Sequence, residues 1–138
     1  MGAGVTARFA LLAALLAAPA ALAQTPSGPI AIELNGVAPQ AGRCRLTFVV
    51  VNKGVALSSL KLDLAAFERD GGVARRVAAE LGPLRAAKTQ VRAYDMDLAC
   101  DRLGSVLVND VTACAPASPE DCLDRLSLAH RGDVRLFK

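Results

Sequence analysis

The sequence predicts an all-β fold, an immunoglobulin-like antiparallel β-sandwich of about seven strands with one short helix near the C-terminus. Apolar residues alternate with polar ones in short runs, the period of two that is typical of strands with one buried face. Turn-forming residues such as Asp70-Gly71 separate these runs about every ten positions. A small β-barrel is the main alternative, because it is built from similar short strands.

The first 23 residues have the pattern of a secretory signal peptide. One basic residue, Arg8, precedes an apolar run, and Ala21-Leu22-Ala23 supplies the small residues for cleavage after position 23. Pro19 interrupts the run, whereas a membrane-spanning helix needs about 18 apolar residues. We therefore expect no stable membrane insertion, a flexible lead-in over residues 24–29 and a single domain over residues 30–138.

Three strands are expected in the first half of the domain. The second shows the pattern most clearly, because Cys44, Leu46, Phe48 and Val50 lie on one face and polar residues on the other. Asn52-Lys53-Gly54 is a turn signal, since asparagine and glycine adopt positive φ at low cost. The expected strands cover residues 30–34, 44–50 and 60–66.

The second half predicts further strands and the helix. The strands are expected at residues 73–81, 89–98 and 105–113. Ser118 as N-cap, Pro119 at the first helical position and acidic residues in the first turn indicate a short helix that ends near Leu126. An extended segment over residues 127–137, with a turn at Arg131-Gly132, then returns to the sheet.

The four cysteines predict two structural disulfides, Cys44–Cys100 and Cys114–Cys122, in a periplasmic or secreted protein. The first would join two distant strands across the core, and the second would fix the helix to the end of a strand. Loop entropy gives about 4 kcal/mol for the first disulfide and about 2.5 kcal/mol for the second. A redox pair would need a C-x-x-C motif, and a zinc site would need free thiols at short spacing, so both alternatives are disfavoured.

Candidate catalytic and metal-binding residues are few. His130, the single histidine, alternates with Leu126 and Leu128, which favours a partly buried structural residue over a general base. Asp95, Asp97 and Asp101 lack the spacing of a calcium loop and are interpreted as solvated carboxylates at a strand end. We expect no catalytic residue, metal or cofactor.

Charge and aromatic content argue against nucleic acid as a partner. The net charge is +3, the basic residues are scattered, and the chain has no Trp and one Tyr to stack on bases. The best candidate for partner binding is residues 73–81 as an edge strand, where Arg75 and Arg76 would discourage self-association and offer donors to an anionic partner.

Three segments resemble one group of exported bacterial proteins. They are residues 81–95, the stretch ACDRLGSVLVNDVTAC at 99–114, and CLDRL at 122–126. From about Cys44 to the C-terminus the chain is similar to the family labelled "Tat pathway signal sequence domain protein". The resemblance implies export but no activity, cofactor or catalytic residue.

These observations favour a non-catalytic periplasmic binding or accessory protein with a partner in the cell envelope. Two alternatives remain open. One is a small secreted hydrolase in which folding brings a hydroxyl group close to His130. The other is an enzyme inhibitor that presents the disulfide-closed loop 114–122, because a rigid loop loses little entropy on binding.

Overall fold

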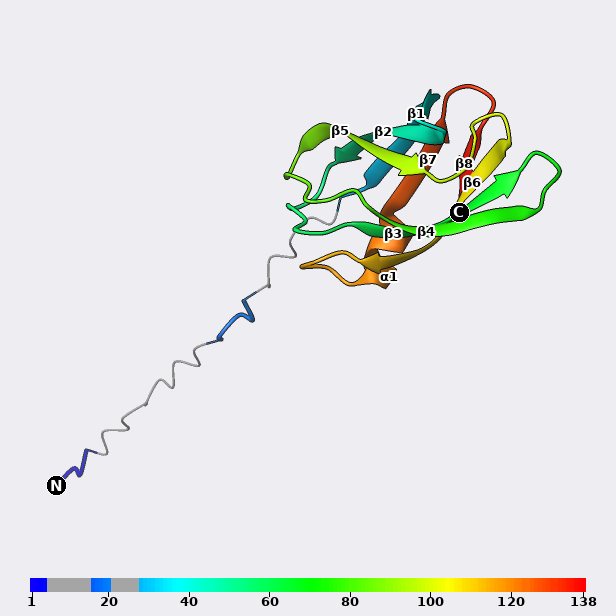
Figure 1. Cartoon of the computed structure of the whole chain (residues 1–138). Helices are drawn as coiled ribbons and strands as arrows, with labels where there is room; N and C mark the ends of the chain where they lie inside the picture. The colour runs from blue at the N-terminus through cyan, green and yellow to red at the C-terminus, as the bar shows by residue number, and fades with distance from the viewer. Residues whose placement is uncertain (5–15, 21–27) are drawn as a thin grey trace.

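The computed structural model describes residues 1–4, 16–20 and 28–138 of the chain (Figure 1). The predicted signal peptide and lead-in fall largely on segments outside the described residues, so both stay predictions. Within the described ranges, no helix has the length and apolar character needed to cross a membrane.

The domain is a sandwich of two four-stranded sheets with one short helix, and it is not closed into a barrel (Figure 1). Its strands are ordered β5-β2-β1-β7 in one sheet and β4-β3-β6-β8 in the other. The predicted fold class is therefore confirmed. The elements are β1 (Ile30–Gln40), β2 (Arg43–Asn52), β3 (Lys61–Glu68), β4 (Val73–Glu80), β5 (Lys88–Met96), β6 (Leu103–Ala113), α1 (Pro119–Arg125), β7 (Leu126–His130) and β8 (Arg135–Phe137).

Alternation along the strands builds the core between the sheets. On β2 every second residue is buried, from Cys44 through Leu46 and Phe48 to Val50, as the sequence predicts. On β3, Leu62 and Leu64 face the same core from the other sheet. A fully buried leucine or phenylalanine contributes roughly 1.5–3 kcal/mol, so these two faces hold the sheets together.

Two elements differ from the expected ones. β1 continues to Gln40, beyond the predicted end at Leu34, because a bulge between Leu34 and Gly36 breaks the alternation while pairing with β2 continues. The C-terminal segment forms two strands in place of one. After a turn at Gly132 (φ +78°), it passes from β7, which pairs in parallel with β1, to β8, which pairs in parallel with β6.

The helix α1 starts and ends as its sequence predicts. The Ser118 hydroxyl accepts a hydrogen bond from the Asp121 N–H at 3.1 Å, and Pro119 occupies the first turn. In the last turn Arg125 pairs with Asp121 at 2.9 Å and donates to the Gly28 carbonyl at 2.9 Å. These bonds connect the helix to the chain just before β1.

Both predicted disulfides form, but one connects different elements from those expected. Cys114–Cys122 joins the end of β6 to α1, as predicted. Cys44–Cys100 does not cross the core between two strands. Cys44 lies opposite Met96 in the β2–β5 ladder, and Cys100 follows in the loop that carries the chain from β5 to β6. The bond therefore anchors the loop between β5 and β6 to the start of β2, which belongs to the same sheet as β5.

Candidate binding groove

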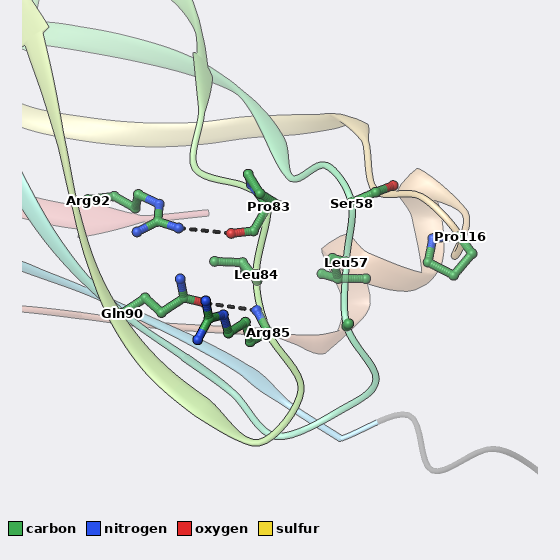
Figure 2. A pocket seen from close by; sticks show the side chains of 9 residues that line it. Leu57, Ser58, Pro83, Leu84, Arg85, Gln90, Arg92 and Pro116 are labelled. Atoms are coloured by element: carbon green, nitrogen blue, oxygen red, sulfur yellow. Dashed lines mark hydrogen bonds between the residues drawn. The ribbon is translucent and has the colours of Figure 1, made fainter.

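A groove of about 520 Å³ lies at one end of the sandwich, within the size range of ligand sites (Figure 2). Three stretches that are distant in sequence form it: the loop between β2 and β3, the loop between β4 and β5 with the start of β5, and the turn after β6. Its lining residues are Ala56, Leu57, Ser58, Pro83, Leu84, Arg85, Gln90, Arg92 and Pro116.

The floor of the groove is apolar and fixed by backbone hydrogen bonds. Leu57 and Leu84 form an isolated antiparallel bridge, with N–H to carbonyl distances of 2.9 and 2.8 Å. Both side chains are almost completely buried and belong to the main core. Pro83 and Pro116 are exposed and form the walls on either side (Figure 2). The groove is thus a surface extension of the core.

One rim of the groove carries cationic and amide donors. Arg92 on β5 donates to the carbonyls of Pro83 at 2.8 Å and Leu81 at 3.1 Å, which holds the β4–β5 loop against the strand (Figure 2). The Gln90 side-chain oxygen accepts the Arg85 N–H at 2.8 Å, and the Gln90 amide N–H groups have no acceptor among the described residues. The Arg85 guanidinium makes no hydrogen bond within the part of the chain that the structure describes.

Glu80 connects the loop between β2 and β3 to the loop between β4 and β5. Its carboxylate accepts from the N–H groups of Leu60 and Gly82 and from the Ser59 hydroxyl, all at 2.8 Å. Burial acts to raise the pKa of Glu80, but the hydrogen bonds from Leu60, Ser59 and Gly82 outweigh it and leave the pKa below its ordinary value. This carboxylate is therefore occupied by the scaffold and does not line the groove.

Asn52 performs a similar role at the end of β2. It is the one buried polar residue among those described, with 1% of its surface exposed. Its amide donates to the carbonyls of Val55 at 2.8 Å and Arg85 at 3.1 Å, and its oxygen accepts the Gly54 N–H at 3.0 Å. The side chain joins the β2–β3 loop to the loop that carries Arg85, so it positions both sides of the groove.

The disulfide-closed loop 114–122 supplies one wall of the groove. The Ala115 carbonyl accepts a hydrogen bond from the Ser58 N–H at 2.9 Å, and the Cys114–Cys122 bond closes the loop behind it. Pro116 is therefore held next to the groove by the hydrogen bond to Ala115 and by the disulfide that closes its loop. The loop that the sequence marked as a possible inhibitory insert is part of the same surface.

Arg75 and Arg76, which the sequence indicates as possible partner-binding residues, both have partners within the protein. They lie on β4, which is an edge strand as expected. Successive residues of a strand point to opposite faces, so the two guanidinium groups diverge. Arg76 pairs with Asp63, whose pKa it lowers through their hydrogen bond. Arg75 instead donates to the Asp97 carbonyl at 3.0 Å.

The edge strands β4 and β5 carry the same arrangement of arginine. Arg75 donates to the carbonyl of the preceding residue, Ala74, at 2.9 Å, and Arg92 donates to that of Val91 at 3.1 Å. Arg75 also donates to the Asp97 carbonyl in the loop between β5 and β6, and Arg92 donates to the Leu81 carbonyl in the loop between β4 and β5. Both loops connect the two sheets. Charged side chains placed in this way on an edge discourage pairing with a further strand.

The remaining candidate residues lie apart from the groove. His130, at the end of β7, is exposed, which corrects the expectation of partial burial: the strand is at a sheet edge, where side chains are less covered. Asp95 pairs with Arg45 at 2.7 Å. Among the described residues, no three metal-ligating side chains form a cluster that could hold an ion.

A second hollow, of about 400 Å³, lies on the outer face of the sheet that contains β1, β2 and β7. Its charged residues, Glu33 and Arg131, form an ion pair with each other at 2.9 Å. Among the described residues, Arg85 of the groove has no such carboxylate partner. The groove is therefore the better candidate for recognition of a charged ligand.

Comparison with known proteins leaves the groove as the main guide to function. No protein-family model matches the chain, and neither curated proteins nor solved structures gave a match. The resemblance to the exported family stays a prediction.

Proposed function

We propose that the protein is a non-catalytic binding or accessory protein of the cell envelope, periplasmic or secreted, which holds an anionic and partly apolar region of a protein partner in the groove. One observation carries the proposal. The groove combines an apolar floor with arginine and amide donors, and no acidic residue lines it. Arginine and a well-packed apolar surface are the features that contribute most to protein recognition.

The disulfides support the proposed compartment. The two bonds use all four cysteines of the chain and indicate an oxidising, extracytoplasmic environment. Cys114–Cys122 braces the groove, because it closes the loop that contains Pro116. A braced groove loses little conformational entropy when it binds, which suits a rigid docking site.

The chemistry of the groove favours binding over hydrolysis. A serine hydrolase needs a hydroxyl oriented by a base. The hydroxyl of Ser58 donates to the Ala115 carbonyl at 3.3 Å, and no histidine, cysteine or carboxylate lines the groove to activate it. Donors without an activated nucleophile can hold an anion but offer no group to attack a substrate.

Site-specific photo-crosslinking in an exporting host tests this proposal. A photoreactive amino acid at Ala56, an exposed lining residue, is expected to give an adduct with an envelope protein. The same amino acid at Ala78, exposed on β4, is the matched control and should not give it. Adding Arg85→Glu should remove the adduct at position 56. Adducts that are identical at both positions, or that survive Arg85→Glu, would contradict the proposal.

A further inference from the structure

We infer that the groove binds the C-terminal residue of its partner polypeptide, with the carboxylate at Arg85 and Gln90 and an apolar side chain between the exposed prolines Pro83 and Pro116, above the buried floor. This inference rests on the proposed function and specifies the chemistry of the bound group. It follows from three features: the unused donors at the rim, the occupied backbone in the floor, and the protected edge strands.

The rim has more donors than the protein itself uses. An arginine has five N–H donors. Arg92 directs three of its nitrogens to the carbonyls of Leu81, Pro83 and Val91. Arg85 uses none within the described residues, and Gln90 contributes an amide group beside it. A planar carboxylate matches the fork of an arginine and accepts two hydrogen bonds at once.

Four backbone N–H groups of the floor are already paired and cannot donate to an extended peptide. The N–H groups of Leu57 and Leu84 donate to each other's carbonyls, that of Ser58 donates to Ala115, and that of Arg85 donates to Gln90. Residues in the middle of a bound chain would place their own N–H and carbonyl groups here without partners, which is unfavourable. A chain end avoids this cost, because its carboxylate and its apolar side chain share one Cα atom and meet the rim and the floor together.

Two of the edge strands, β4 and β5, disfavour the other common mode of peptide binding. Strand addition needs the free backbone groups of an edge strand. Arg75 on β4 and Arg92 on β5 each hydrogen-bond a carbonyl of their own strand. A strand added to either edge would have to displace the arginine of that edge from its carbonyl. Docking of a chain end in the groove leaves all of these bonds intact.

Fluorescence anisotropy with a labelled peptide tests the inference on the exported, disulfide-intact protein. The probe is an N-terminally labelled Gly-Ser-Gly-Ser-Ala-Leu with a free carboxylate, and its matched control is the same peptide with a C-terminal amide. A charge-assisted hydrogen bond contributes enough for about a tenfold change in Kd, so we expect at least that loss for the amide. Replacing the terminal leucine with serine should also weaken binding, because the floor is apolar.

Variants of the protein supply the second arm. Arg85→Gln should weaken the acid peptide about tenfold and leave the amide peptide unchanged. Arg43→Gln, which alters an exposed arginine at the opposite end of β2, should change neither. Ala56→Glu places a carboxylate in the groove and should abolish binding, while Ala56→Gln should retain it.

The outcomes separate this inference from the proposed function. Equal affinity for acid and amide, or an equal effect of Arg85→Gln and Arg43→Gln, would overturn the carboxylate assignment. Failure of the acid peptide to bind at millimolar concentration would overturn the chain-end inference, whereas an Arg85-dependent crosslink at position 56 would still support a partner in the groove. A crosslink at position 56 that persists in the Arg85→Glu variant would overturn both the proposed function and the chain-end inference.

Discussion

Replacing Asn52 with aspartate should destabilise the domain strongly at neutral pH. The change substitutes an oxygen for the nitrogen that donates to the carbonyls of Val55 and Arg85 at 2.8 and 3.1 Å. Each of these partly buried carbonyls, left without its donor, costs about 1–3 kcal/mol, so the pair gives about 4 kcal/mol. That is a large part of the roughly 5–15 kcal/mol that stabilises a domain.

The loss should depend on pH with a defined sign. Burial beside two carbonyl oxygens raises the pKa of the introduced carboxyl above its ordinary value of about 3.9, because the charged form is disfavoured there. A group whose pKa is raised on folding contributes its stability fully below the unfolded pKa and loses it as the pH rises through the folded pKa. The deficit of Asn52→Asp should therefore be smallest near pH 4 and largest at pH 7.

Urea unfolding is monitored by circular dichroism at pH 4 and pH 7 for the wild type and for Asn52→Asp. The difference in the free energy of unfolding between the two proteins gives the stability loss at each pH. Asn35→Asp is the matched control, because Asn35 is exposed and makes one side-chain bond, to Glu33. Its cost should stay below about 1 kcal/mol. A deficit under about 1 kcal/mol for Asn52→Asp at pH 7, or one that does not shrink at pH 4, would refute the reasoning.

Three further predictions concern the disulfides, the edges and the acid response. Replacing Cys44 and Cys100 with alanine should cost about 4 kcal/mol in urea unfolding, more than the roughly 2.5 kcal/mol for the other pair, because the sequence separations are 56 and 8; a reversed order contradicts this. Arg92→Val should increase self-association in sedimentation velocity while Arg43→Val should not, and equal behaviour would argue against edge protection. Glu80 has a lowered pKa, so its contribution is present above its unfolded pKa of about 4.3 and lost as the pH falls toward the folded value. In Glu80→Gln the free energy of unfolding should therefore fall less steeply below about pH 4.3 than in the wild type. An unchanged dependence on pH in this range would contradict this role.

The sequence predicts those parts of the fold that depend on local pattern. β2 is recognised from the alternation of Cys44 through Val50, since one face must be buried, and α1 is recognised from Ser118 and Pro119. The end of β1 is missed because a bulge at Gly36 interrupts the period. The parallel pairing of β7 with β1 depends on where the whole chain returns, which no local pattern records.

The groove was not predictable for a related reason. Its lining comes from three separate stretches, and Arg85 and Arg92 appear in the sequence only as scattered basic residues. Asn52 was interpreted as a turn residue, although its buried side chain connects two loops. The one useful local signal was the pair of prolines, Pro83 and Pro116, which mark irregular backbone near the groove.

The two arginines of the edge strands help to explain why recognition would concentrate at one point of the surface. Arg75 and Arg92 direct their donors to carbonyls of the protein itself, so they leave few donors for a partner. Arg76 is neutralised by Asp63 in the same way. Arg85 differs because it lies in a loop beyond the strands, where its backbone is held by Asn52 and Gln90 while its guanidinium is left uncommitted. A fixed backbone with a free cationic side chain above an apolar floor is the arrangement that favours selective capture of an anionic chain end.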